Sequence, residues 1–364
     1  MVYLPEMIYD ILSLNETSEY YMGIKRGVYM IKLAVTGTGM LVQELLPVLK
    51  EMKEIEVAVL CGTKRSEETL KKLCRQYEIP VSYTDYSEML DSEELKDVDA
   101  VYLAVPNDLH YRMAKMALKA GLHVFLEKPF ASNEKEAAEL IEIARKKKLF
   151  LVEAISNQYL PVYETVRSLI PKLGDIRLVN CNFSQYSSRY DRFLAGEYFR
   201  VFDPERSGGT LMDLNCYNLH FVAGLFGEPE QVMYHANVNR GVDTSGVVHM
   251  VYPGFQCLCT AAKDSEGPGE LLIQGVKGYL MLQTKANTLS GPILLYETKK
   301  GKIREIEVKE ETHRVIPEFC AYARMLEERD YEQCLERQEE TLKVCRIMDQ
   351  ARRSAGIHFP ADDR

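Results

Sequence analysis

The segment IKLAVTGTGMLVQELL, residues 31–46, decides the fold. It opens with a short continuous apolar run, which is typical of a strand buried on both faces of a parallel sheet. Two glycines follow, Gly37 and Gly39, and a helical stretch begins at about Met40. Gly37 permits a tight turn, and Gly39 leaves room for a pyrophosphate to approach the backbone at a helix N-terminus. The segment therefore predicts the opening of a βαβ unit that binds a dinucleotide.

The rest of the first half repeats this alternation of short strands with amphipathic helices. Strands that alternate with helices of this length form βαβ units with right-handed crossovers. We therefore predict an α/β protein that begins with a doubly wound, parallel Rossmann sheet. The predicted strands are 31–35, 56–61, 100–105, 123–126 and 150–152, and the predicted helices start at about Met40 and Ser66 or cover 109–120 and 133–148.

The loop after the second strand is basic. It contains Thr63, Lys64 and Arg65, and no acidic residue occurs before Glu67. An acid at this place normally binds the ribose hydroxyls of NAD. An acid would repel the 2′-phosphate of NADP, whereas a lysine and an arginine would pair with it. We therefore favour NADP(H) over NAD(H). The alternative for the basic residues is a solvated loop without a ligand, and the alternative for the glycine segment is an ordinary βα turn.

After residue 155 the pattern changes to strand-like runs that follow one another through glycine-rich turns. Strands without intervening helices indicate a largely antiparallel sheet. We expect an N-terminal extension, 1–29, a Rossmann domain, 30–155, and a C-terminal α+β domain with an open-faced sheet, 156–364, whose last helices can pack back on the Rossmann domain. The predicted strands are 176–186, 231–239, 247–252, 256–261 and 270–274, and the predicted helices are 211–225, 315–327 and 338–355.

The composition limits the partners and the compartment. The formal net charge is −9 at pH 7, which argues against a nucleic-acid partner. No apolar run approaches the length of a membrane span, and the first residues lack the pattern of a signal peptide. The nine cysteines include no CxxC pair and no zinc-site spacing. We expect a small-molecule substrate, no metal, free thiols and a cytoplasmic location.

Three short motifs carry a resemblance to a known family. They are AVPNDLH at 104–110, LEKP at 126–129 and GGTLMDLNCY at 208–217. Together with the glycine turn, they resemble the Gfo/Idh/MocA oxidoreductases, over essentially the whole chain from Ile31 onward. Within that family the chain resembles the dimeric dihydrodiol dehydrogenase and NADP-dependent xylose dehydrogenase type.

This resemblance implies that Lys128, Asp213 and Tyr217 are catalytic. Lys128 ends a strand, where ligands of open α/β sheets bind, and its ammonium can hydrogen-bond the reacting oxygen. Asp213 and Tyr217 are spaced to share one face of a helix, and a phenol can donate a proton to an alkoxide. The alternatives are a surface lysine and a core tyrosine. The predicted cofactor contacts are Gly37, Thr38, Gly39, Met40, Leu41, Thr63, Lys64, Arg65, Val105, Pro106, Asn107, His110, Glu127 and Lys128.

The predicted reaction is hydride transfer between the nicotinamide and a hydroxyl or carbonyl carbon of a sugar, polyol or cyclic diol. Arg189 and His220 are further candidates for substrate contacts, with a solvated turn and a structural histidine as the alternatives. Asn215, Gln158 and Ser156 depart from the family's glycine, arginine and tryptophan, so the substrate of the relatives cannot be copied over.

Two other functions fit the same sequence. A non-catalytic regulator on this fold would sense a dinucleotide or a sugar, and a reductase of a non-sugar substrate would need a larger apolar pocket. The exposed face of the antiparallel sheet needs cover, so we also expect a homodimer or homotetramer through that face.

Overall fold

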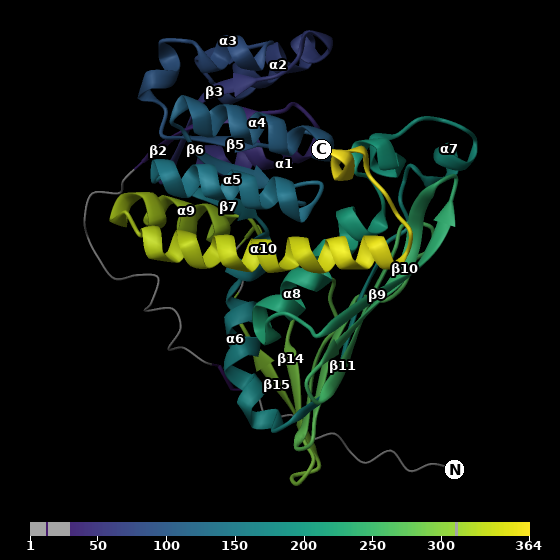
Figure 1. Ribbon diagram of the computed structural model, residues 1–364. Helices are drawn as coiled ribbons and strands as arrows, with labels where there is room; N and C mark the ends of the chain where they lie inside the picture. The colour runs from purple at the N-terminus through teal and green to yellow at the C-terminus, as the bar shows by residue number, and fades with distance from the viewer. Residues whose placement is uncertain (1–11, 14–29, 310–311) are drawn as a thin grey trace.

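The computed structural model describes residues 12–13, 30–309 and 312–364. Two sheets organise the chain (Figure 1): a parallel sheet between helices, and a larger, mixed sheet. The long helix α10, Tyr331–Ser354, contacts elements of both sheets and starts earlier than predicted. Apart from the short strand β1, Leu12–Ser13, the predicted N-terminal extension lies outside the described residues. None of the described helices has the length and apolar content that a bilayer crossing requires.

The parallel sheet has the strand order β4-β3-β2-β5-β6-β7. Ile31, Leu33 and Val35 of β2 pack into the core on one face, whereas Ala34 packs into the core on the other. A strand buried on both faces must be apolar throughout, which is the pattern that opened this half of the sequence. The predicted doubly wound fold is confirmed. The strands are β2 Ile31–Thr36, β3 Ile55–Cys61, β4 Val81–Tyr83, β5 Ala100–Leu103, β6 His123–Glu127 and β7 Leu151–Ala154.

Helices from distant parts of the chain cover this sheet. Phe319, on a helix near the C-terminus, lies with its ring 5.4 Å from that of Tyr102 in β5. Tyr322 of the same helix stacks on Phe125 of β6, with ring centres 4.3 Å apart. The end of the chain therefore completes the core that its first half begins. One face is covered by α1 Met40–Glu51, α2 Glu67–Tyr77 and α9 Ile316–Glu328, and the other by α4 Asn107–Ala120 and α5 Glu134–Lys147.

The second sheet has the strand order β1-β15-β14-β13-β12-β8-β11-β10-β9. Its neighbouring strands are antiparallel except for the pairs β1–β15 and β8–β11, so the predicted largely antiparallel sheet is confirmed. The sheet also contains β13, β14 and β15, which the sequence pattern did not predict. The strands are β8 Ile176–Ser184, β9 Gln231–Asn239, β10 Val242–Tyr252, β11 Phe255–Ala262, β12 Glu270–Gly275, β13 Gly278–Leu282, β14 Ile293–Glu297 and β15 Lys302–Glu307.

Helices pack on one face of this second sheet. The apolar core there combines alternate strand residues with side chains of α6, Pro161–Leu169, α8, Cys216–Phe226, and α10. Successive side chains of a strand point to opposite faces, and the residues between the core positions stay accessible. Leu178, Met233 and Leu258 on that other face are 46%, 49% and 41% exposed. The sheet is therefore open-faced, as predicted.

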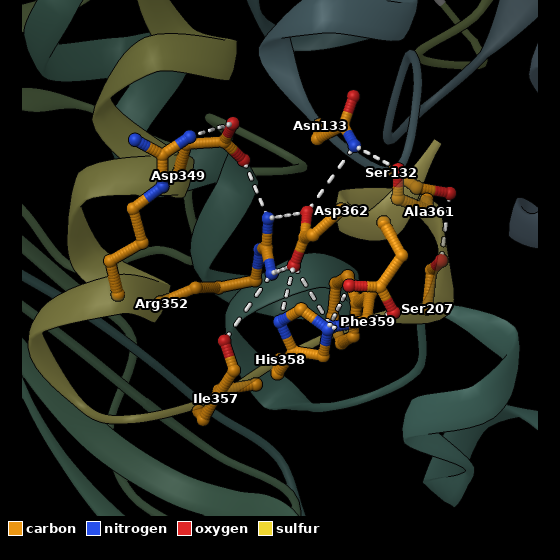
Figure 2. A network of polar contacts seen from close by, with 12 residues as sticks. Ser132, Asn133, Ser207, Asp349, Arg352, Ile357, His358, Phe359, Ala361 and Asp362 are labelled. Atoms are coloured by element: carbon orange, nitrogen blue, oxygen red, sulfur yellow. Dashed lines mark hydrogen bonds and ion pairs between the residues drawn. The ribbon is translucent and has the colours of Figure 1, made fainter.

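The last residues of the chain return to the start of α5 (Figure 2). The buried Arg352 of α10 donates to the carboxylates of Asp349 at 2.8 Å and of Asp362 at 2.7 Å. The amide of Asn133, the N-cap of α5, donates to the Ala361 carbonyl oxygen at 2.9 Å and to Asp362 at 3.2 Å. This network ties α10, the C-terminal tail and α5 into one unit.

The network predicts an acid-sensitive contribution to stability. Burial alone would raise the pKa of Asp362, but hydrogen bonds from Arg352 and the Phe359 N–H outweigh it and lower the pKa to about 2. A carboxyl whose folded pKa lies below its unfolded value stabilises the fold above that unfolded value, and the stabilisation is lost as the pH falls from about 4 to about 2.

We therefore expect Asp362→Asn to be less stable than the wild type at neutral pH, and to lose less stability on acidification through that window. Urea unfolding midpoints across the window measure both effects. Asp363→Asn is the matched control, because this exposed carboxylate contacts only the exposed His358 within the described residues. Equal acid sensitivity of Asp362→Asn and the wild type would contradict the prediction.

Candidate active site

The glycine turn joins two strand ends and leaves a helix N-terminus open. Gly37 has φ +124°, and a Cβ there would lie 2.2 Å from the Ala104 carbonyl oxygen, so only glycine fits. Gly39 is the N-cap of α1, with no side-chain cap and no acid in the first turn. A Cβ on Gly39 would meet nothing within 4 Å. This helix N-terminus can therefore receive an anion. The turn is completed by Thr38, Met40 and Leu41.

The predicted basic loop lies beside the glycine turn. A Cβ on Gly62, directly after β3, would lie 3.1 Å from the Thr38 methyl carbon. The loop then forms a short 3₁₀ turn that begins at Thr63. Lys64 and Arg65 are exposed, and neither forms an ion pair within the described part of the chain. The structure therefore brings two exposed cations to the edge of the sheet where the glycine turn lies.

The connection after β5 is held by a buried histidine. Val105 and Pro106 link β5 to α4. The two ring nitrogens of His110 each lie 2.8 Å from a carbonyl oxygen, one of Val105 and one of Pro129. His110 is 1% exposed. Burial lowers the pKa of His110, so the ring is neutral and its one N–H donates to one of these two carbonyl oxygens. His110 thus lies between the ends of β5 and β6, and its contact with the cofactor stays a prediction.

Asn107 and Glu127, two further predicted cofactor contacts, have protein partners. The Asn107 side chain donates to the Ser207 carbonyl oxygen at 3.0 Å. The Ser207 and Ser132 hydroxyls are hydrogen-bonded at 2.7 Å, as Figure 2 shows. Glu127 accepts from the Tyr102 hydroxyl and, at 3.2 Å, from the next N–H of the chain, and burial raises its pKa. The contacts of Asn107 and Ser132 with Ser207 fasten the residue before the GGTLMDLNCY segment to the nucleotide-binding half, whereas those of Glu127 lie within that half.

Lys128 meets Asp213 where the two halves of the chain face each other. Lys128 directly follows β6, and its Nζ donates to the Asp213 Oδ1 at 3.0 Å and to the Asp213 carbonyl oxygen at 2.9 Å. The two side chains are 15% and 28% exposed. Burial alone would lower the pKa of Lys128, but the Asp213 carboxylate outweighs it and raises the pKa well above the ordinary value. At neutral pH the ammonium is therefore a fixed, charged donor.

Tyr217 lies over the same ammonium. The Lys128 Nζ is 5.0 Å from the centre of the Tyr217 ring. Asp213 lies in a π-helical turn, Leu211–Asn215, that continues into α8, whereas the sequence analysis predicted one regular helix. Such turns are frequent at functional sites. Burial raises the pKa of Tyr217 to about 12, against the opposing charges of Lys128 and Arg314. The structure thus brings the three predicted catalytic side chains together.

A glycine and a buried acid set the start of the π-helical turn. Gly209 has φ +126°, and a Cβ there would lie 2.0 Å from an Asp243 carboxylate oxygen. Asp243 accepts hydrogen bonds from the Leu211 N–H at 2.7 Å and from the Tyr234 hydroxyl at 2.8 Å, and burial raises its pKa to about 6. The second glycine of the Gly-Gly pair is therefore required by this close approach.

Sequence reasoning missed two cations at the site. Lys263 directly follows β11 and contacts the second carboxylate oxygen of Asp213. Arg314 precedes α9, and its guanidinium donates to the Ser156 hydroxyl at 2.8 Å. Neither lies in a family motif, and a lone cation beside a strand or a helix usually faces solvent. Only the folded chain shows that both point inward.

Asn215, which replaces a family glycine, has a structural contact that a glycine could not make. Its amide donates to the Cys259 carbonyl oxygen of β11 at 2.9 Å, and its oxygen accepts from the Asn218 amide at 2.9 Å. It is completely buried. Asn215 therefore anchors the π-helical turn to the second sheet.

The two predicted substrate contacts have different surroundings. His220 is 1% exposed, and its Nε2 lies 3.2 Å from a Glu153 carboxylate oxygen. Its Nδ1 faces the Gln158 amide at 3.5 Å. This interior position favours the structural alternative for His220. Arg189 is half-buried just before α7, Tyr190–Leu194, and its contact with a substrate stays a prediction.

Family models match both halves of the chain. The model for the Gfo/Idh/MocA oxidoreductase family with an NAD-binding Rossmann fold matches residues 31–154, and that for the Gfo/Idh/MocA C-terminal domain matches residues 163–281. The chain belongs to the Gfo/Idh/MocA oxidoreductase family. Lys128 lies in the first match, and Asp213 and Tyr217 lie in the second. The family resemblance of the three motifs is confirmed.

Individual relatives cover nearly the full length. Scyllo-inositol 2-dehydrogenase (NADP(+)) of Bacillus subtilis is 30% identical over 334 residues, which are 92% of this chain and 99% of the relative. Trans-1,2-dihydrobenzene-1,2-diol dehydrogenase of Xenopus tropicalis is 26% identical over 90% of this chain and 99% of its own. A 3-ketoreductase from Actinomadura kijaniata, solved with NADP and TDP-benzene, shares the fold with a TM-score of 0.76 at 20% identity, covering 89% of this chain and 98% of that chain.

Proposed function

We propose that this oxidoreductase uses NADP(H) to interconvert a hydroxyl and a carbonyl group on a polyol, sugar or cyclic diol. The observation that carries the proposal is the meeting of Lys128, at the end of a Rossmann strand, with Asp213 and Tyr217 of the other half. An ammonium, a carboxylate and a phenol placed together can bind and protonate an alkoxide. Two relatives are named for a cyclic polyol and a cyclic diol, which supports this substrate class.

The residues present fit a bound NADP(H). Gly37 and Gly39 leave the turn and the N-terminus of α1 free for a pyrophosphate. Lys64 and Arg65 are exposed cations at the position that reads the adenosine ribose, and they suit a 2′-phosphate. The Bacillus relative is named for NADP(+), and the Actinomadura structure contains NADP. When bound, the nicotinamide supplies or accepts the hydride.

The side chains of the site orient the substrate and handle one proton. Lys128 donates a hydrogen bond to the reacting oxygen, and its charge stabilises an alkoxide at that atom. Tyr217, with a pKa of about 12, holds its proton at neutral pH and can pass it to the more basic alkoxide. Asp213 orients the Lys128 ammonium through their hydrogen bond and keeps it protonated. In the oxidation direction, the substrate hydroxyl gives its proton to the deprotonated form of Tyr217 or Lys128, so we expect this direction to speed up as the pH rises.

A substrate panel with Lys128→Met tests this function. We expect NADP-dependent oxidation of inositols, cyclic diols or aldoses by the wild type, followed by absorbance of the reduced nicotinamide. Lys128→Met should lower kcat/KM by about a hundredfold or more, because the charged donor is lost, while calorimetry shows that NADP(H) still binds. Lys119→Met, an exposed residue of α4, is the control. Full biological activity of Lys128→Met would favour a sensor, and turnover of apolar carbonyls alone would favour a non-sugar reductase.

The basic loop predicts the cofactor preference. Replacing both Lys64 and Arg65 by Gln removes the two charges proposed for the 2′-phosphate. We expect the KM for NADP to rise by about tenfold to a hundredfold, as for lost charge-assisted hydrogen bonds, and the KM for NAD to change little. Lys71→Gln is the matched control, since Lys71 lies on the next helix and is paired with Glu67. A wild type that uses NAD alone would overturn the proposal.

We propose that a second copy covers the open face of the mixed sheet in a homodimer or homotetramer. The exposed Leu178 of β8, Leu258 of β11 and Met233 of β9, on the same face of the sheet, support this. Leu258→Glu should lower the molar mass in light scattering, because it would bury an unpaired charge in the interface. Val276→Glu is the control, since Val276 is as exposed but lies in a turn. A monomeric wild type would contradict the proposal.

We further propose a cytoplasmic location. All nine cysteines are free and most of them are buried, which suits a reducing compartment.

A further inference from the structure

Lys263 is a rigidly placed cation beside the proposed catalytic side chains. Its N–H donates to the Thr244 carbonyl oxygen at 2.7 Å, and its own carbonyl oxygen accepts from the Ser187 N–H at 2.9 Å. The backbone is thus held from both sides at the end of β11. The side chain is only 5% exposed, so its ammonium is buried within the protein.

The ammonium of Lys263 is directed at Asp213. It contacts the Oδ2 of that carboxylate and lies 5.2 Å from the centre of the Phe202 ring. The carboxylate of the next residue, Asp264, has other partners: it accepts hydrogen bonds from the hydroxyls of Thr244 and Ser245 at 2.7 and 2.9 Å. Within the described residues, Asp213 is the acid that Lys263 pairs with.

Each oxygen of the Asp213 carboxylate therefore serves a different lysine. Oδ1 accepts from Lys128 at 3.0 Å, and Oδ2 accepts from Lys263. One anion between the half-buried Lys128 and the buried Lys263 is a costly arrangement, because pairing offsets only part of the free energy lost on burial of a charge. A side chain kept only for packing against Phe202 would be apolar. The shared carboxylate therefore needs an explanation in the chemistry of the site.

We propose that Lys263 is a positioning residue for the reaction. By holding Oδ2, it fixes the orientation of Asp213, and by sharing the carboxylate charge, it limits how tightly Asp213 holds the proton of Lys128. The inference rests on the proposed function, because it assigns Lys263 an effect on the step in which Lys128 and Tyr217 handle the substrate proton.

The charges around Lys128 determine whether removal of Lys263 raises or lowers the pKa of Lys128. The groups that act on Lys128 are Asp213, Tyr217, Cys216 and Glu127, and Arg314 acts on Tyr217. Among the described residues, Asp213 is the group that contacts both Lys128 and Lys263. Without Lys263, the undivided negative charge of Asp213 acts on Lys128, so the pKa of Lys128 rises further. The site then releases a proton only at higher pH.

The test compares Lys263→Met, Lys263→Arg and the exposed control Lys300→Met in the full-length enzyme. Lys263→Met should lower kcat for alcohol oxidation by about tenfold and leave the KM for NADP unchanged. Its pH–rate profile should move to higher pH by about one unit, because Lys128 holds its proton more tightly. Lys263→Arg should restore most of kcat and most of the wild-type pH–rate profile. Lys300→Met should change neither kcat nor the profile. An unmoved profile, or an arginine variant as impaired as the methionine variant, would overturn the proposal.

A mutant cycle isolates the path through Asp213. If Lys263 acts through this carboxylate, Lys263→Met should add less than about twofold to the loss already caused by Asp213→Asn. Fully multiplicative losses would overturn the proposal. Lys263→Met keeps Asp213 paired with Lys128, so no buried charge is left alone; if it fails to fold, Lys263→Gln removes the same charge. A wild type that is inactive with every alcohol tested would contradict the proposed function. An active wild type whose pH–rate profile is the same as that of Lys263→Met would contradict this inference alone.

Discussion

The contact between Lys128 and Asp213 is the constraint on which the rest of the site depends. It joins residues 85 positions apart, one after a strand of the parallel sheet and one in a turn against the mixed sheet. His110 contacts the Pro129 carbonyl oxygen in the loop after Lys128, and Asp243 holds the turn that carries Asp213. Misplacement by about 1 Å can cost much of a catalytic effect, so both supports are needed.

The charges around Tyr217 favour a negatively charged oxygen there. Asp213 is ionised, because Lys263 and Lys128 outweigh its burial and hold its pKa well below the ordinary value. On the far side, burial and the nearby Glu127 raise the pKa of Glu318 to about 8, so that this acid is largely protonated at neutral pH. At the phenol itself, the cations Lys128 and Arg314 oppose the effects of burial and of the nearby Glu127. Both cations would also stabilise an alkoxide at this place.

Local patterns predicted the parts of the site that lie within one strand-and-turn unit. The glycine turn at Gly37 and the basic loop at Lys64 follow from hydrophobic periodicity and from where ligands bind on a parallel sheet, whereas the role of Lys128 follows from the family resemblance of its motif. Lys263 could not be predicted, because its contact with Asp213 spans 50 residues and depends on the pairing of β11. The π-helical turn escaped for a similar reason, since it is set by Asp243 on another strand.

The C-terminal helix α9 completes the core of the nucleotide-binding half. Phe319 and Tyr322 of α9 fill the face of the parallel sheet behind Tyr102 and Phe125, so that residues 30–155 by themselves would expose this aromatic core. The C-terminal tail also binds Asn133, which ends the loop that begins at Lys128. The C-terminal tail thus supports the end of the loop that follows the proposed catalytic lysine. The turn against the mixed sheet brings Asp213 to that lysine, so the proposed site needs both halves of the chain.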